Sequence, residues 1–203
     1  IDLDRLGALV SKTITPDVRE GNPQPRVTEY RDAMLCSIGI PSKGPEHYVD
    51  EVVPFYRNFR PPLVCSISAS TAAAFGELAA RVSVDGVAVI EANISCPNLE
   101  QDGRAFAMEE AATRSAIAAI KAASDRPIWA KLTPNVGDIT LIARAAATGG
   151  ADALVVANAL LGMAIDTESF RPKLGNLMGG LTGPAVKPVI LRRVYQCAQA
   201  VDL

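Results

Sequence analysis

Residues 90–98 have the sequence IEANISCPN, an apolar run that turns polar at its end. The run and the residues just before it alternate too little for a surface strand and are too short for a helix, so they predict a buried parallel strand. The proline after the cysteine cannot donate to a sheet ladder and marks the start of a loop. Two carboxamides, Asn93 and Asn98, flank the thiol of Cys96 there. An α/β enzyme presents catalytic groups in this way, at the carboxyl edge of its sheet.

Four other apolar runs have the length of strands. The five predicted strands are 6–11, 63–68, 87–94, 127–132 and 153–157. Apolar residues at helical spacing, together with capping residues, predict helices between them. The predicted helices are 45–59, 71–82, 109–123, 138–147 and 187–200. Repeated strand–helix units imply a parallel sheet, either doubly wound or closed as a barrel.

The carboxyl ends of these strands favour the barrel. The polar or reactive residues found there are Lys12, Ser66 and Ser68, Asn93 with Cys96, Lys131, and Asn158. Groups contributed by many successive strands fit the mouth of a barrel better than the single crevice of an open sheet. Eight strands close such a barrel, and five are predicted. We therefore expect one TIM-type (β/α)8 barrel domain over 1–203 with about five strand–helix units, incomplete at both ends, lacking one strand in front and two behind.

Three segments are predicted to lack regular structure. Residues 15–26 contain three prolines and form a long loop. The apolar patch at 34–40 is expected to be a loop segment that folds over a pocket. Residues 175–183 contain four glycines and predict a backbone-flexible loop.

The composition is that of a globular protein. The chain has 203 residues, of which 49% are hydrophobic and 21% charged. Its formal net charge of -2 gives no broad basic surface, which argues against a nucleic-acid partner. The sequence contains no run of about 18 apolar residues and no signal-peptide pattern at residues 1–5, so we expect no membrane association and a cytoplasmic location.

The four cysteines are too far apart for a zinc or iron–sulfur site, and no metal is expected. Cys96 is distinguished by its position between carboxamides. A thiolate there can abstract a proton from carbon while carboxamides hold a planar, carbonyl-rich substrate. The residues alone leave a catalytic thiol and a buried structural cysteine equally open. Lys131 closes an apolar strand, so a fully solvated lysine is the less favoured interpretation.

Five motifs, in order along the chain, resemble those of the dihydroorotate dehydrogenases. They are GNPQPR at 21–26, NISCPN at 93–98, KLTPN at 131–135, NALLGMAID at 158–166 and GGLTGPAVKP at 179–188. Together they span essentially the whole chain. The resemblance implies an FMN-containing eight-stranded barrel that oxidises dihydroorotate to orotate in pyrimidine biosynthesis.

The resemblance also implies roles in substrate chemistry. Cys96 matches the catalytic base, which removes a proton from the substrate's C5 while hydride passes from C6 to flavin N5. Asn93, Asn98 and Asn158 match asparagines that hold the pyrimidine ring. Lys12 matches a lysine near both the flavin and the substrate carboxylate.

The cofactor contacts that the resemblance implies are Lys12, Thr13, Asn93 and Lys131. Lys131 matches the lysine beside the flavin's N1 and O2 edge, where a cation stabilises the anionic reduced ring. A cysteine base resembles the soluble class. The residues LGMAID at 161–166 are most similar to members that pair with an iron–sulfur, FAD-carrying electron-transfer subunit, and a homodimer is expected as well.

Two positions depart from the family pattern. Cys36 stands where the family has a fourth substrate asparagine, and Ala159 stands where it usually has serine or threonine. Each departure removes polar contacts to the substrate, at a cost on the order of 1 to 3 kcal/mol. Two alternatives therefore stay open: an FMN oxidoreductase acting on another dihydropyrimidine or cyclic amide, and an inactive barrel relative that acts as a binding partner. A redox pair between Cys36 and Cys96 is a further hypothesis.

Overall fold

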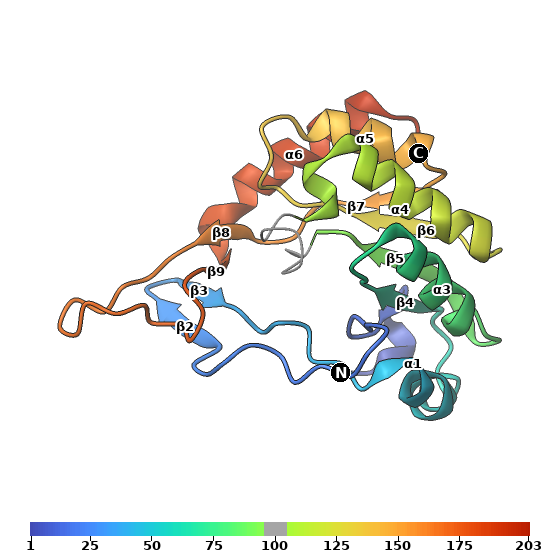
Figure 1. Ribbon diagram of the computed structural model, residues 1–203, viewed down its shortest axis with the longest axis horizontal. Coiled ribbons are helices and arrows are strands. Elements are labelled where there is room, and N and C mark those ends of the chain that lie inside the picture. Colours follow the sequence, from blue (N-terminus) through green and yellow to red (C-terminus); the bar gives the residue numbers. More distant parts are fainter. Residues whose placement is uncertain (96–104) are drawn as a thin grey trace.

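A curled parallel sheet forms the centre of the structure, a computed structural model that describes residues 1–95 and 105–203. Its strands are β1 (Leu9–Val10), β4 (Leu63–Ile67), β5 (Val87–Asn93), β6 (Ile128–Lys131) and β7 (Ala153–Val155). They pair in parallel in the order β1-β4-β5-β6-β7. This order follows the chain without the reversal of a doubly wound sheet. The sheet therefore forms an open half-barrel, which confirms the α/β fold expected of a partial TIM-type barrel (Figure 1).

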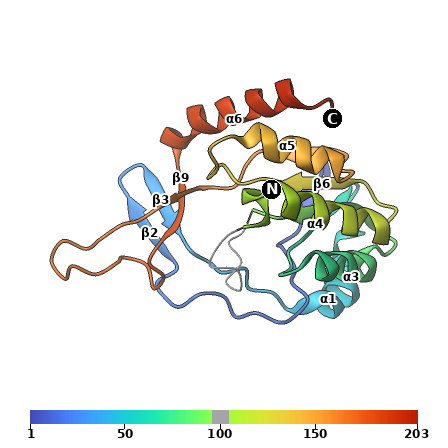
Figure 2. The same cartoon turned by 45° about the horizontal axis from the view of Figure 1, so that its top comes forward.

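Helices cover one face of this sheet. They are α3 (Ala72–Val82), α4 (Glu110–Ala123), α5 (Ile139–Thr148) and α6 (Lys187–Ala200). Figure 2 shows them following one another around the outside of the curl, and consecutive helices pack together. The side chains of Thr71 and Asp138 accept hydrogen bonds from the first turns of α3 and α5, as their residue types predict.

The strands of the large sheet alternate between an apolar and a polar face. Their apolar side chains, which pack in the core with the helices, include Cys65, Ile67, Ile90, Ala92, Ile128 and Ala130. Because successive side chains of a strand point to opposite faces, the intervening residues face the inside of the curl. Ser66, Glu91, Asn93 and Lys131 occupy those inner positions.

A second, antiparallel sheet corrects two of the expectations from sequence. Its strands are β2 (Val27–Tyr30), β3 (Ala33–Cys36), β8 (Leu160–Gly162) and β9 (Gly179–Thr182), in the order β2-β3-β9-β8. The segments 34–40 and 175–183, predicted to be loops, therefore each contribute a strand. The glycines of β9 allow close approach, because a Cβ atom on Gly179 would lie 2.8 Å from the carbonyl oxygen of Cys36.

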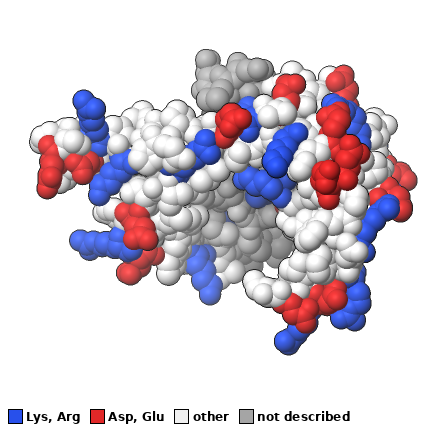
Figure 3. Space-filling view, turned by 90° about the horizontal axis from the view of Figure 1, so that it is seen from below, with Lys and Arg blue, Asp and Glu red and all other residues white. Residues whose placement is uncertain are grey.

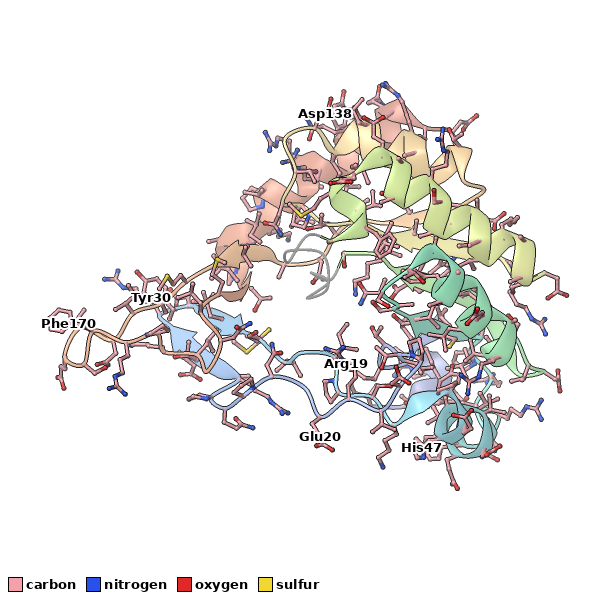
Figure 4. The ribbon with its side chains drawn as sticks, in the orientation of Figure 1. Arg19, Glu20, Tyr30, His47, Asp138 and Phe170 are labelled. Atoms are coloured by element: carbon pink, nitrogen blue, oxygen red, sulfur yellow. The ribbon has the colours of Figure 1, made fainter. Side chains whose placement is uncertain are left out.

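The small sheet and the loop between β8 and β9 project from the helix-covered part of the molecule (Figure 1). Figure 4 shows Tyr30 and Phe170 on this projection, on the opposite side of the molecule from His47. Both aromatic side chains are exposed, Phe170 to 83%. The projection therefore presents apolar side chains that no helix covers.

The helix predicted at 45–59 is divided into three pieces. They are α1 (Gly44–His47), a π-helical segment (Tyr48–Val52) and α2 (Val53–Tyr56). Pro54 has no N–H to donate to the preceding turn, and this missing hydrogen bond accounts for the irregular winding. Short 3-10 helices lie at Leu3–Arg5, Phe106–Met108 and Pro184–Val186.

Surface charge and helix length are the two features relevant to nucleic-acid and membrane partners. On the face seen in Figure 3, Lys and Arg side chains lie among Asp and Glu in small groups and form no broad patch of one sign. Among the helices of 1–95 and 105–203, none has the length and apolar content needed to cross a membrane.

Candidate active site

The strand register brings polar side chains together at the carboxyl edge of the large sheet. Ser66 lies opposite Glu91 in the pairing of β4 with β5, and Asn93 lies opposite Lys131 in the pairing of β5 with β6. Glu91 and Asn93 are two residues apart on one strand, so they face the same side. A parallel bridge after β1 places the neighbouring Thr13 beside this group.

Four of these groups form a buried run of hydrogen bonds. Ser66 Oγ donates to Glu91 Oε1 at 2.7 Å. The hydroxyl oxygens of Thr13 and Ser66 lie 2.9 Å apart, and Asn93 Nδ2 donates to Thr13 Oγ1 at 3.1 Å. Each of the four residues is less than one tenth exposed. Two of the predicted cofactor contacts, Thr13 and Asn93, are therefore in direct contact although they lie 80 positions apart in the sequence.

The run continues through Ser95 to the segment that follows β7. Ser95 Oγ donates to Asn93 Oδ1 at 2.7 Å and accepts from Asn158 Nδ2 at 2.8 Å. Asn158 Oδ1 in turn accepts from the backbone N–H of Ala159 at 2.8 Å. The two predicted substrate asparagines that the structure describes, Asn93 and Asn158, are thus joined by a single hydroxyl.

Lys131 supplies a positive charge next to this run. Its Nζ lies 4.0 Å from Glu91 Oε1, and its side chain is 27% exposed. The carboxylate of Glu91 is 5% exposed, so the pair lies largely within the protein. The lysine is therefore held at the inner face of the sheet and is not a fully solvated surface residue.

The remaining predicted site residues are Lys12, Cys96 and Asn98. Lys12 follows β1 at the same edge and is exposed. Cys96 and Asn98 lie outside the described residues. The hypothesis of a redox pair between Cys36 and Cys96 therefore stays a prediction. Cys36 itself is a free, partly exposed cysteine.

The two departures from the family pattern lie on either side of one glycine. Cys36 pairs with Gly180 in the register of β3 with β9. A Cβ atom on Gly180 would lie only 2.8 Å from the Cβ of Ala159. Positions far apart in the sequence therefore meet on the small sheet, next to Asn158.

Two other cysteines are structural. Burial raises the pKa of Cys65 to about 12, and it also raises the pKa of Cys197. Both thiols therefore stay protonated near neutral pH, and a thiol is a poor base or nucleophile in that form. Within 1–95 and 105–203, no group of three or more His, Cys, Asp or Glu side chains is arranged to hold a metal ion.

Sequence reasoning missed the residues that fix the loops around this edge. Asn135 joins the loop after β6 to β8, because its Nδ2 donates to the carbonyl of Ala159 at 3.1 Å and its Oδ1 accepts from Leu161 N at 2.9 Å. Arg193 of α6 donates to the carbonyl of Val136 at 2.7 Å in the same loop. Glu91 and Ser95 were also missed, although an acidic residue inside an apolar strand is a signal that the sequence does contain.

Comparison with known proteins gives one consistent result. A family model described as dihydroorotate dehydrogenase matches residues 1–203. The catalytic subunit of dihydroorotate dehydrogenase B (NAD(+)) from Desulforamulus reducens is 46% identical over 204 residues, covering 100% of this chain and 67% of that protein. The protein of the same name from Citrifermentans bemidjiense is 43% identical with the same coverage.

A third relative of that name, from Desulforudis audaxviator, is 46% identical over all of this chain and 66% of its own length. The chain thus spans about two thirds of these relatives. Their names are those of catalytic subunits, which implies that those proteins work with a partner subunit. The chain belongs to the dihydroorotate dehydrogenase family, flavin-dependent oxidoreductases of pyrimidine biosynthesis.

Proposed function

We propose that the protein oxidises dihydroorotate to orotate with FMN as its cofactor. The observation that carries this proposal is the hydrogen-bonded group of Asn93, Ser95 and Asn158 beside Lys131, at the edge of the sheet where barrel enzymes bind substrates. Carboxamides offer donors and acceptors together, which suits the alternating N–H and C=O groups of a pyrimidine ring.

The chemistry of the donors fits a flavin ring. We assign Lys131, Thr13, Asn93 and Lys12 to the cofactor. The ammonium group of Lys131, half-buried beside the run of hydrogen bonds, suits the N1 and O2 edge of the ring, where it stabilises negative charge. When bound, FMN supplies the acceptor for the hydride that leaves C6 of the substrate.

The protein's own groups hold the substrate and take its proton. Asn93, Asn98 and Asn158 orient the pyrimidine ring, and Lys12 faces the substrate carboxylate. The thiolate of Cys96 removes the proton from C5. Loss of that proton and of the C6 hydride together leaves the C5–C6 double bond of orotate, so the substrate is oxidised by two electrons.

The wider organisation is also part of the proposal. We assign residues 1–203 to a single FMN barrel domain, with both sheets in it. The names of the relatives support a partner subunit. We infer an iron–sulfur, FAD-carrying electron-transfer subunit, a homodimer of the catalytic subunit and a cytoplasmic location.

The test is anaerobic reduction of the protein-bound flavin by dihydroorotate. The reduction is measured as the loss of the flavin's visible absorbance. A Cys96→Ala variant is expected to slow the bleaching by about 100-fold or more, the usual contribution of a general base. Cys197→Ala is the control, since that cysteine is a buried residue of α6 and takes no part in the run of hydrogen bonds. Bleaching of the Cys96 variant at the normal rate would remove the base assignment, and an unbleached wild-type flavin would remove the function.

A second candidate substrate is favoured by the meeting of Cys36 and Ala159 at Gly180. A site that has lost an asparagine and a hydroxyl there suits a dihydropyrimidine with fewer polar substituents, such as dihydrouracil. Bleaching by dihydrouracil in place of dihydroorotate would select this candidate. Absence of bound flavin from the full-length protein would instead select a catalytically inactive relative that acts as a binding partner.

A further inference from the structure

We propose that Glu91 is a positioning residue that fixes the orientation of the Asn93 and Asn158 carboxamides. Glu91 is 4% exposed, and it lies at one end of the hydrogen-bond run described above. The inference rests on the proposed role of the two asparagines in holding the substrate. The physical basis of the proposal is that the direction of each hydrogen bond in the run is determined by the bond before it.

The direction is set first at the carboxylate. A carboxylate only accepts hydrogen bonds, so Ser66 must give its single hydroxyl proton to Glu91. The oxygen of Ser66 is then free only to accept. Thr13, whose hydroxyl oxygen lies 2.9 Å away, must therefore donate to Ser66.

The same reasoning fixes Asn93. With its own proton committed, Thr13 can only accept from Asn93, so the amide must turn its Nδ2 toward Thr13. The Oδ1 atom of Asn93 then points to Ser95 and takes that hydroxyl proton. Rotating the amide by half a turn would place two acceptors, Oδ1 and Thr13 Oγ1, against each other.

Asn158 is fixed from both sides. Ser95 has given its proton to Asn93, so it accepts from Nδ2 of Asn158. The other atom of that amide, Oδ1, faces the backbone N–H of Ala159, which can only donate. The run therefore lies between an obligate acceptor at Glu91 and an obligate donor at Ala159. Both ends require the same direction, and Glu91 imposes it more strongly because its hydrogen bond from Ser66 is charge-assisted whereas the bond from Ala159 is neutral.

The arrangement also accounts for the buried negative charge of Glu91, which would otherwise be energetically unfavourable. A carboxylate inside a protein is unfavourable unless it is paired and hydrogen-bonded. Glu91 has Lys131 at 4.0 Å and Ser66 at 2.7 Å. One carboxylate oxygen, Oε1, thus interacts with both the lysine and the serine that begins the run. Each asparagine therefore offers its remaining N–H and lone pair in a defined arrangement.

The decisive variant is Glu91→Gln, which keeps the size of the side chain. A glutamine amide can donate to Ser66 as well as accept, so the direction is then imposed only by the neutral bond at the Ala159 end. We expect orotate to bind the oxidised holoenzyme on the order of tenfold more weakly, measured from the change in flavin absorbance. Glu46→Gln, at an exposed ion pair with Arg81, is the matched control and should bind orotate as the wild type does.

Ser66→Ala tests the same run of hydrogen bonds while leaving the negative charge of Glu91 in place. It cuts the run between Glu91 and Thr13 but leaves Glu91 beside Lys131. We expect a similar loss of orotate affinity, and adding Glu91→Gln to Ser66→Ala should cause a smaller loss than Glu91→Gln causes alone. Additive losses in the double variant, or wild-type affinity in both single variants, would overturn the proposal.

A readout that needs no substrate separates this inference from the proposed function. The side-chain amide NMR signals of Asn93 and Asn158 should shift in both Glu91→Gln and Ser66→Ala holoenzymes, and stay in place in Glu46→Gln. If the wild type binds no orotate, the proposed function fails while these signals still test the positioning role. Unshifted signals in both variants would overturn that role whatever the substrate is.

Discussion

The large parallel sheet and the small antiparallel sheet are stabilised in different ways. The large sheet is covered by helices, and buried side chains of its strands pack with Phe75, Ile117 and Ile142 of the helices. The small sheet joins segments from distant parts of the chain and leaves side chains such as Tyr30 and Met34 exposed. Apolar burial is the main favourable term in folding, so the large sheet is expected to carry most of the stability.

The two sheets also differ in the part of the proposed function that their residues serve, the large sheet in catalysis and the small sheet in substrate selectivity. The run of hydrogen bonds from Glu91 to Asn158 is attached to the large sheet, where strand register fixes the positions of Ser66, Glu91 and Asn93. Both departures from the family pattern lie against the small sheet, at Gly180. A rigid frame that carries catalytic groups and a less buried element that adjusts the pocket is a common division in enzymes.

The largest expected effect is in the core under the helices. Phe75 is fully buried on α3 and its ring meets that of Phe106 edge to face, with centroids 5.4 Å apart. Phe75→Ala should lower the free energy of unfolding by about 3 to 5 kcal/mol in urea denaturation. Phe170→Ala on the projecting loop, where the side chain is 83% exposed, should change it by about 0.5 kcal/mol or less. Equal losses would mean that the projection shares the main core.

An intermediate effect is expected in the small sheet. A Cβ atom on Gly179 would lie 2.6 Å from Leu174 Cδ1 and 2.8 Å from the carbonyl oxygen of Cys36. Gly179→Ala should therefore destabilise the sheet locally by about 1 to 3 kcal/mol, seen as faster amide exchange in β3 and β9. Exchange in β4 to β6 should stay slow.

The control for this substitution is Gly137→Ala, because a Cβ atom there meets nothing within 4 Å. It should leave exchange unchanged in both sheets. Faster exchange of β5 in the Gly179 variant would show that the two sheets open together and would contradict their separation.

The smallest effect on stability is expected from two aspartates, Asp152 beside the large sheet and Asp166 on the projecting loop. Burial alone would raise the pKa of Asp152, but hydrogen bonds from Ile128 N and Lys121 lower it below its usual value. Hydrogen bonds from Ser169 likewise lower the pKa of Asp166 on the projecting loop. A lowered folded-state pKa favours folding above pH of about 4, and this contribution is lost as the pH falls through the folded value.

Urea unfolding at a series of pH values from 7 to 3 measures how much Asp152 and Asp166 each contribute to the pH dependence of the free energy of unfolding. Asp152→Asn should flatten the acid side of the stability profile, since Asp152 accepts from a strand of the large sheet. Asp166→Asn should leave that profile unchanged and speed exchange only near residues 166–170. A flattened profile for Asp166→Asn would place the loop within the cooperative unit.

Much of the large sheet was predictable because its signals are local. The strands at 63–67 and 87–93 and the helices at 72–82 and 110–123 lie within one residue of the predicted bounds. The position of Lys131 at the end of an apolar strand also indicated that this lysine is not fully solvated, and its side chain is 27% exposed. The small sheet was missed because β3 and β9 pair across about 145 positions, and glycines that signal a loop here permit close backbone contact.

The alternation of strands and helices, the family, and the side chains at the strand ends can all be read from the amino-acid sequence, because they follow from short-range periodicity and from motifs. Which of those side chains meet depends on how the chain folds. The contacts of Thr13 with Ser66, of Asn93 with Thr13 and of Asn158 with Ser95 span 53, 80 and 63 positions. They depend on strand register and on the curl of the sheet, since a shift of one residue would turn Glu91 into the apolar core.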